Sequence, residues 1–251
     1  MSCVYLQQIN RSIFFILLII VLTMTLSCKT LQEQSEITQF QSQSEIVETP
    51  QNVISFVEER NKIITSAKNL MGIKYNTQGI EVNGKKFTID CIGTIRAAFW
   101  GAGIDIAQDF YKYTGNGVAL LYFSLKERDA LKKDKVPAVG DVIFWDNTWD
   151  KNGDGVFGND ALTHAGIVLE IDNDGTIKYL HASVSKGVTI GVMNLHTPSL
   201  WQNETGKIIN SGMYLGSYYG NPQNPPQWTS GDLFRAFGDC TKIIEIYKNK
   251  I

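Results

Sequence analysis

The stretch TIDCIGTIRAAF, residues 88–99, joins a short extended run to the first turns of a helix and places Cys91 at the junction. A cysteine at a helix N-terminus lies beside unpaired backbone N–H groups and the positive end of the helix dipole. Both favour the thiolate, which is the nucleophilic form of cysteine. Three interpretations of Cys91 follow: a buried apolar side chain, one half of a disulfide, or a nucleophile.

Helical patterns lie before residue 137 and strand patterns lie after it. Residues 49–71, which open with Thr49-Pro50, and residues 91–102 carry apolar side chains at helical spacing. Residues 73–85 read as a loop and 105–134 as further helix or loop. The β-rich runs are GDVIFWD, LTHAGIVLEI, TIKYLHAS and GVTIGVMNL, with DNDG as a hairpin signal between the second and the third. We therefore predict an α+β domain whose N-terminal helices pack on an antiparallel β-sheet or meander.

The first 48 residues read as a targeting segment and a tether. Residues 11–28, RSIFFILLIIVLTMTLSC, place an apolar run after a basic residue and end it on Cys28. The run is shorter than the roughly 20 residues of a membrane-spanning helix. It resembles a bacterial lipoprotein signal, in which the cysteine is lipidated, although Thr25 stands where an aliphatic residue is usual. We predict a signal peptide over 1–28, a disordered tether over 29–48 and a folded domain over 49–251.

This interpretation predicts an exported protein, held on a bacterial membrane by the lipid on Cys28 and facing the periplasm or the cell surface. An ordinary signal or an uncleaved anchor is the alternative, and both also imply export. In an oxidising compartment two cysteines of a folded domain often form a disulfide. Pairing of Cys91 with Cys240 would remove the nucleophile. The formal net charge of −2, with no basic block, argues against nucleic acid as a partner.

A nucleophilic cysteine needs a base, and the chain has three histidines. Strand alternation puts His164 and Gly166 on one face, and we expect Gly166 to leave room for the helix that carries Cys91. His181 ends the next strand, so two adjacent antiparallel strands could bring both imidazoles together. His181 would then orient His164, as the third member of a catalytic triad does. His196 is the reserve for that third position.

Five stretches together resemble the NlpC-type cell-wall cysteine peptidases: AKNLMGIKYN, DCIGTIRAAFWGAGIDI, VPAVGDVIFWD, THAGIVLEI and YLHAS. The resemblance covers about residues 63–195 and implies a papain-like endopeptidase that cuts peptidoglycan stem peptides between D-glutamate and the diamino acid. It implies Cys91 as the nucleophile, His164 as the general base and His181 as the third, polar member. Tyr75 would line the site and help to hold the oxyanion. We expect a monomer that needs no cofactor.

Three departures from the family pattern leave alternatives open. Ile92 follows the cysteine where the family usually has Ser, and Gln78-Gly79 stands in a longer loop where Gly-Gly is usual. The stretch before His164 is also enlarged. A CHAP-type amidase, which splits the stem from the sugar, therefore remains possible, and so does an inactive wall-binding lipoprotein.

The enlarged stretch contains the opening of a calcium loop. Asp150, Asn152 and Asp154 place oxygen ligands at alternate positions before Gly155, and Asp160 falls one place before the position of the usual closing glutamate. Ala161 occupies that twelfth position. The sequence thus predicts either a structural calcium site beside His164 or a polar turn without metal.

Overall fold

The computed structural model describes residues 50–213 and 227–248, with the backbone alone for 50–55. The fold below is that of the unit Asn52–Ile251, together with the first residues of the helix that leads into it. The predicted signal peptide and tether lie outside the described residues. They remain predictions.

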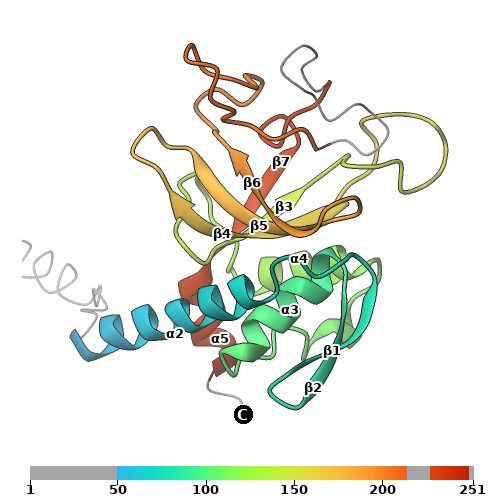
Figure 1. Cartoon of the computed structure of the whole chain (residues 1–251). Helices are drawn as coiled ribbons and strands as arrows, with labels where there is room; N and C mark the ends of the chain where they lie inside the picture. The colour runs from blue at the N-terminus through green and yellow to red at the C-terminus, as the bar shows by residue number, and fades with distance from the viewer. Residues whose placement is uncertain (1–49, 214–226, 249–251) are drawn as a thin grey trace, which may run out of the picture. The chain divides into compact units, whose positions relative to one another are not determined.

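The helices form one layer of this unit (Figure 1). Pro50 is the first helical residue of α2, as expected of a residue with no N–H to satisfy. Ile63, Ala67 and Leu70 form its buried face. Val57 and Met71, which the periodicity had placed with the apolar face, are 48% and 45% exposed. The elements of this layer are α2 (Pro50–Asn69), α3 (Cys91–Gly101), the short 3-10 helix η1 (Phe110–Lys112), α4 (Gly117–Glu127) and α5 (Cys240–Lys248).

A hairpin stands where the sequence predicted a loop. Strand β1 (Thr77–Val82) pairs antiparallel with β2 (Lys85–Ile89). The two turn residues between them, Asn83 and Gly84, have φ of 45° and 76°. Asn-Gly is the pair that favours this left-handed two-residue turn, so the Asn83-Gly84 pair already indicates a hairpin in the sequence.

The second layer is a five-stranded antiparallel sheet with the strand order β6-β5-β4-β3-β7. Its first four strands along the chain are the four predicted runs, and the DNDG turn closes with Gly175 N–H donating to the Asp172 carbonyl at 2.9 Å. The α+β prediction is therefore confirmed. The strands are β3 (Val142–Trp145), β4 (His164–Ile171), β5 (Ile177–Ser183), β6 (Gly187–Met193) and β7 (Phe234–Gly238).

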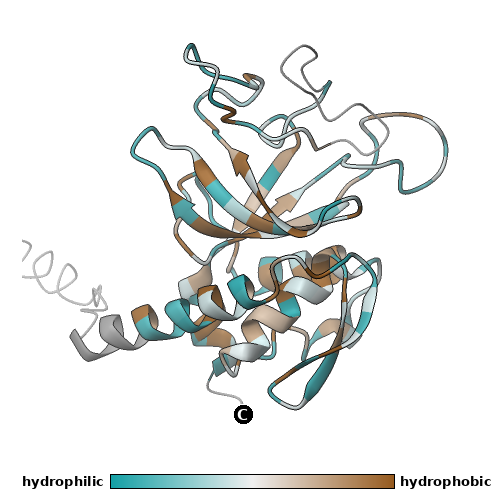
Figure 2. Cartoon of the chain, viewed as in Figure 1, coloured by the Kyte–Doolittle hydropathy of each residue, from teal (hydrophilic) through white to brown (hydrophobic). Residues whose placement is uncertain are grey.

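Each face of the sheet has its own apolar cluster. Ala165, Ile167 and Leu180 face the helices and join the larger core with them. Val168 and Tyr179 face the other way, where Met213 from the C-terminal segment packs on them. Figure 1 shows the helices on one side of the sheet and the loops after β6 on the other, and Figure 2 shows the apolar residues of the strands between them. The sheet is consequently covered on both faces, and the loops after β6 can shape a site on the face away from the helices.

Candidate active site

Asp90 fixes the start of α3 and thereby the position of Cys91. Its backbone is extended (φ −118°, ψ −170°), and its carboxylate accepts a hydrogen bond from Gly93 N–H at 2.6 Å. This is an N-cap, which satisfies one of the free donors of the first helical turn. A Cβ on Gly93 would lie 1.9 Å from the Thr88 carbonyl oxygen, so the turn before the helix needs glycine there. The sequence motif Asp-Cys-x-Gly thus sets Cys91 as the first helical residue.

The two predicted histidines meet across β4 and β5. His164 Nε2 and His181 Nδ1 are 2.9 Å apart, with the rings nearly perpendicular at 89°. Both rings lie beside aromatic residues on the sheet face away from the helices: Trp145 is 5.7 Å from His164 and Tyr179 is 5.3 Å from His181, between ring centroids. The structure therefore brings these two imidazoles together, as the strand pattern predicted.

The prediction for Gly166 was wrong in one respect. Its face of β4 points away from α3, and the space above Gly166 is taken by the Trp145 ring rather than by the helix of Cys91. A Cβ there would lie 3.1 Å from a ring carbon of Trp145 and 2.8 Å from the Leu180 carbonyl oxygen. Gly166 thus leaves space for the ring of Trp145, which lies beside His164.

The side chain of Cys91, the first residue of α3, lies next to the beginning of β4. The backbone N–H of Ala165, the residue after His164, is one of three backbone donors that stabilise the thiolate of Cys91, together with those of Ile92 and Cys91 itself. The sulfur is therefore close to the strand residue that carries the predicted base. Because His164 uses Nε2 toward His181, its Nδ1 is the nitrogen left for the sulfur.

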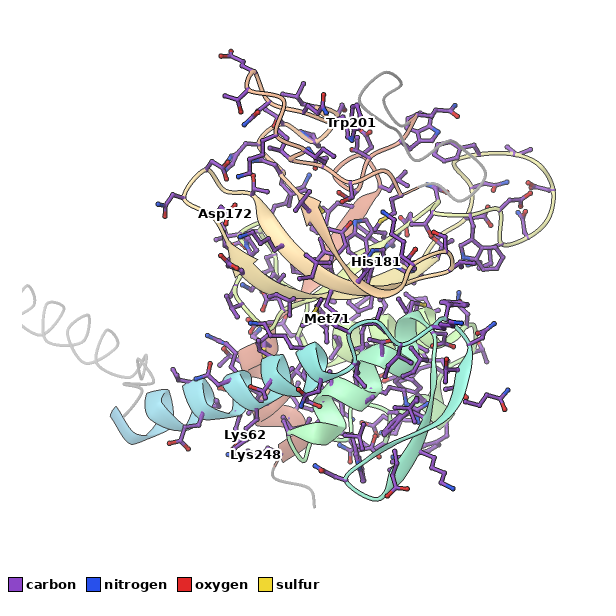
Figure 3. All side chains as sticks on the ribbon, in the orientation of Figure 1. Lys62, Met71, Asp172, His181, Trp201 and Lys248 are labelled. Carbon is purple, nitrogen blue, oxygen red and sulfur yellow. The ribbon has the colours of Figure 1, made fainter. Side chains whose placement is uncertain are left out.

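A cavity of about 530 Å³ joins the predicted residues. Tyr75, Cys91, His164 and His181 all line it. Its other walls come from residues that the sequence did not predict as part of the active site. They are Thr148, Trp149 and Thr163 from the stretch before β4, the β5–β6 turn, and Trp201, Ile208 and Met213 from the C-terminal segment. In Figure 3, His181 lies on the sheet and Trp201 in the segment above it. Loop residues of this kind carry no periodic signal, which is why sequence reasoning missed them.

The thiol and the imidazole are both uncharged in the resting site. Burial, and then the negative charge of Asp90, raise the pKa of Cys91 to about 12, against the opposing effect of the backbone N–H groups. Burial lowers the pKa of His164 to about 4. The helix N-terminus therefore does not hold a thiolate here, contrary to the expectation from its position alone. A Cys91 sulfur in this state would have to lose its proton before or during an attack on a substrate.

Tyr75 keeps its proton and remains a hydrogen-bond donor. Burial raises the pKa of Tyr75, and the nearby Cys91 and Asp90 raise it further. A neutral hydroxyl on the cavity wall can stabilise an oxygen that gains negative charge.

The other cysteine and the third histidine stand apart from this cavity. Cys91 and Cys240 are both free, so the disulfide interpretation is not realised. Cys240 is fully buried at the start of α5, where its N–H donates to Asp141 at 3.0 Å. His196 packs against the turn at Gly175, where a Cβ would lie 2.7 Å from its ring, and it does not line the cavity.

Ile92, the departure from the family pattern, has a packing contact with α4. A Cβ on Gly117 would lie 2.6 Å from an Ile92 methyl carbon. The N-cap of α4, Asn116, also donates from Nδ2 to the Leu162 carbonyl at 3.0 Å, two residues before His164. Ile92 thus packs the start of α4 against α3, and Asn116 links that start to the enlarged stretch.

The predicted calcium ligands are occupied by the loop's own donors. Asp150 accepts from Gly153 and Gly155 N–H at 2.7 and 2.8 Å, and Asp160 accepts from Asn152 N–H at 3.1 Å. The Oδ1 of Asp154 accepts from a backbone N–H. Within residues 50–213 and 227–248, no three His, Cys, Asp or Glu side chains gather as metal ligands would. Calcium binding by this loop remains a prediction without support from the structure.

A cysteine at a helix start and a histidine pair on an antiparallel sheet, together around one cavity, define the papain-like hydrolase class. The model of the NlpC/P60 family matches residues 72–209, more than half of the chain, and the chain belongs to that family of cell-wall peptidases. A search of curated proteins finds no match. Among the described residues no helix is long and apolar enough to span a membrane.

Proposed function

We propose that the chain is a cysteine endopeptidase that cuts peptidoglycan stem peptides between D-glutamate and the diamino acid. One observation carries the proposal: Tyr75, Cys91, His164 and His181 line the same cavity, with the two imidazoles 2.9 Å apart. The family supplies the substrate class, and the cavity supplies the chemical groups.

In the first half of the reaction the Cys91 sulfur attacks the amide carbonyl and its proton passes to His164 Nδ1. His181 accepts the hydrogen bond from His164 Nε2–H, which keeps Nδ1 free in the resting site and stabilises the imidazolium once it forms. The Cys91 backbone N–H and the Tyr75 hydroxyl donate to the carbonyl oxygen as it becomes negative.

In the second half the imidazolium gives its proton to the leaving amine, and the C–N bond breaks. The acyl group remains on the sulfur as a thioester. Water then enters, loses a proton to His164 Nδ1 and attacks the thioester carbonyl. The carboxylic acid leaves and the sulfur recovers its proton, so that the neutral thiol and imidazole return.

We propose further that the chain is exported, is lipidated at Cys28 and acts as a monomer on a bacterial membrane, facing the periplasm or the cell surface. The support is the order of basic residue, apolar run and small residues before Cys28. Residues 29–48 would then serve as the tether between the anchor and the folded domain.

A digest of whole peptidoglycan tests the proposed reaction. Wild-type protein should release fragments whose masses show a new D-glutamate terminus, and Cys91→Ala should release none. The Cys240→Ala variant is the matched control, because it removes the other described thiol and leaves the cavity intact. Release of glycan strands without stem peptides would instead identify an amidase, and identical digests from wild type and Cys91→Ala would contradict a cysteine hydrolase.

A further inference from the structure

The cavity has a lysine on its wall. Among the described residues that line it, Lys186, in the turn between β5 and β6, is the only Lys or Arg, and Asp90 is the only Asp or Glu. The turn follows directly after β5, the strand that carries His181. Figure 3 labels His181. A single ammonium group on the wall of a catalytic cavity is a candidate determinant of substrate choice.

The backbone next to Lys186 is hydrogen-bonded to residues 72–73, which directly precede Lys74 and Tyr75. Gly72 N–H donates to the Val188 carbonyl and Val188 N–H donates to the Ile73 carbonyl, both at 2.8 Å. Gly187 has φ of 72°, and a Cβ on it would lie 2.4 Å from the Ile73 carbonyl oxygen. The turn therefore has a fixed position relative to Tyr75, and the lysine extends from an ordered base.

The ammonium group of Lys186 has no ion-pair partner within the part of the chain that the structure describes. Its backbone N–H donates to Ser183 Oγ at 3.4 Å, and no described residue forms a hydrogen bond or an ion pair with its Nζ. Lys178, at the other end of the same strand, is by contrast paired with both Glu170 and Asp172. A cation with no internal partner at a cavity wall is available to an anionic group of a ligand.

Two charged side chains on the cavity wall, Asp90 and Lys186, affect the ionisable groups around it. The negative charge of Asp90 raises the pKa of Cys91 and of Tyr75. The positive charge of Lys186 contributes, after burial and His164, to lowering the pKa of His181. The charge of Asp90 therefore acts on Cys91 and Tyr75, and the charge of Lys186 acts on His181.

We propose, resting on the proposed function, that Lys186 is a specificity-determining residue whose ammonium group binds a carboxylate next to the scissile amide. A stem peptide linked through the side chain of D-glutamate offers two such groups. One is the free α-carboxylate of the glutamate, and the other is the second carboxylate of an acidic diamino acid such as diaminopimelate. A substrate in which the contacted carboxylate is amidated loses this interaction.

Three synthetic peptides of the form L-Ala-γ-D-Glu-diaminopimelate distinguish the two sources. The first has both carboxylates free, the second is amidated at the glutamate α-carboxylate, and the third is amidated at the side-chain carboxylate of the diamino acid. For wild type we expect amidation of one of the two positions to lower kcat/KM about tenfold, mainly through KM, as for a hydrogen bond to a charged group.

Variants at Lys186 complete the experiment. Lys186→Met should cleave all three peptides at the same reduced rate, and Lys186→Arg should keep the discrimination. Lys74→Met is the matched control, because Lys74 is exposed beside Tyr75 yet does not line the cavity, so its removal should leave the discrimination intact.

Two results would overturn the role of Lys186 while leaving the proposed function standing: equal cleavage of the three peptides by wild type, or discrimination that survives in Lys186→Met. Failure of wild type to cleave any of the peptides would contradict the proposed function, and the role of Lys186 with it.

Discussion

His164 and His181 are joined Nε2 to Nδ1 at 2.9 Å across two neighbouring strands. A hydrogen bond between two neutral imidazoles leaves each ring in one tautomer. With the proton on His164 Nε2, its Nδ1 is unprotonated and can accept the proton of a thiol. In the proposed mechanism the proton lies on His164 Nε2, so that Nδ1 is the nitrogen available to the thiol.

Removal of the orienting ring should reduce catalysis more than binding. In His181→Ala the proposed base, His164, loses the acceptor that selects its tautomer, and we expect kcat to fall about 10²-fold with a small change in KM. His181→Asn retains an acceptor oxygen and should recover part of the loss. Steady-state kinetics on the γ-D-glutamyl peptide measure both, and an unchanged kcat in His181→Ala would exclude an orienting role.

Activity should extend to acidic pH. Burial lowers the pKa of His164 to about 4, and a protonated imidazole cannot accept the thiol proton. The value of kcat/KM should therefore stay level from neutral pH downward and fall only as pH decreases through about 4. A half-maximal point near 6.5, the ordinary value for histidine, would show that the ring is not held neutral by burial. Circular dichroism at each pH separates this loss from unfolding.

The charge and the capping role of Asp90 can be separated. Asp90→Asn removes the charge that raises the pKa of Cys91 but keeps an oxygen that accepts from Gly93 N–H. Alkylation of Cys91 at a fixed pH near 8 should become faster, with almost no change in the free energy of unfolding. Asp90→Ala should also speed alkylation, but at a loss of about 1 kcal/mol from the missing cap. Equal alkylation rates in wild type and Asp90→Asn would contradict the electrostatic role. The Cys91→Ala variant measures the alkylation that occurs at other sites.

Gly166 should be intolerant of any side chain. Gly166→Ala places a Cβ 3.1 Å from the Trp145 ring and 2.8 Å from the Leu180 carbonyl oxygen, so we expect a loss of about 1–3 kcal/mol in unfolding free energy. The six-membered part of the indole makes the ring contact, and a second substitution, Trp145→Phe, should therefore make Gly166→Ala less costly than it is alone. Urea denaturation of the four proteins tests this. A fully additive cycle would mean that the ring is not the obstacle.

Local patterns were sufficient for most of the fold and for bringing Tyr75, Cys91, His164 and His181 to one cavity. The alternation in THAGIVLEI and YLHAS predicts two neighbouring strands and the meeting of His164 with His181. The apolar spacing of residues 91–102 predicts the helix that begins at Cys91, whereas its cap by Asp90 was recognised only in the structure. Neither β7, which pairs with β3 across a long separation, nor the wall formed by Trp201 and Met213 could be found this way. Both depend on contacts between distant segments.

The ionisation of Cys91 shows a different limit. Its position at a helix N-terminus favours the thiolate, and sequence alone gives no measure of the opposing burial. In the structure burial and Asp90 outweigh the backbone donors, and the pKa rises rather than falls. The net effect depends on the walls that β4 and the C-terminal segment build around the sulfur.

The central claim, covalent catalysis by Cys91, is tested most directly by intact-mass spectrometry of the protein quenched in acid during turnover of the γ-D-glutamyl peptide. We predict a mass increase equal to the acyl fragment, mapped to the tryptic peptide that contains Cys91, which disappears once the substrate is consumed. Hydrolysis that proceeds with no adduct on Cys91, and that continues in Cys91→Ala, would contradict the claim.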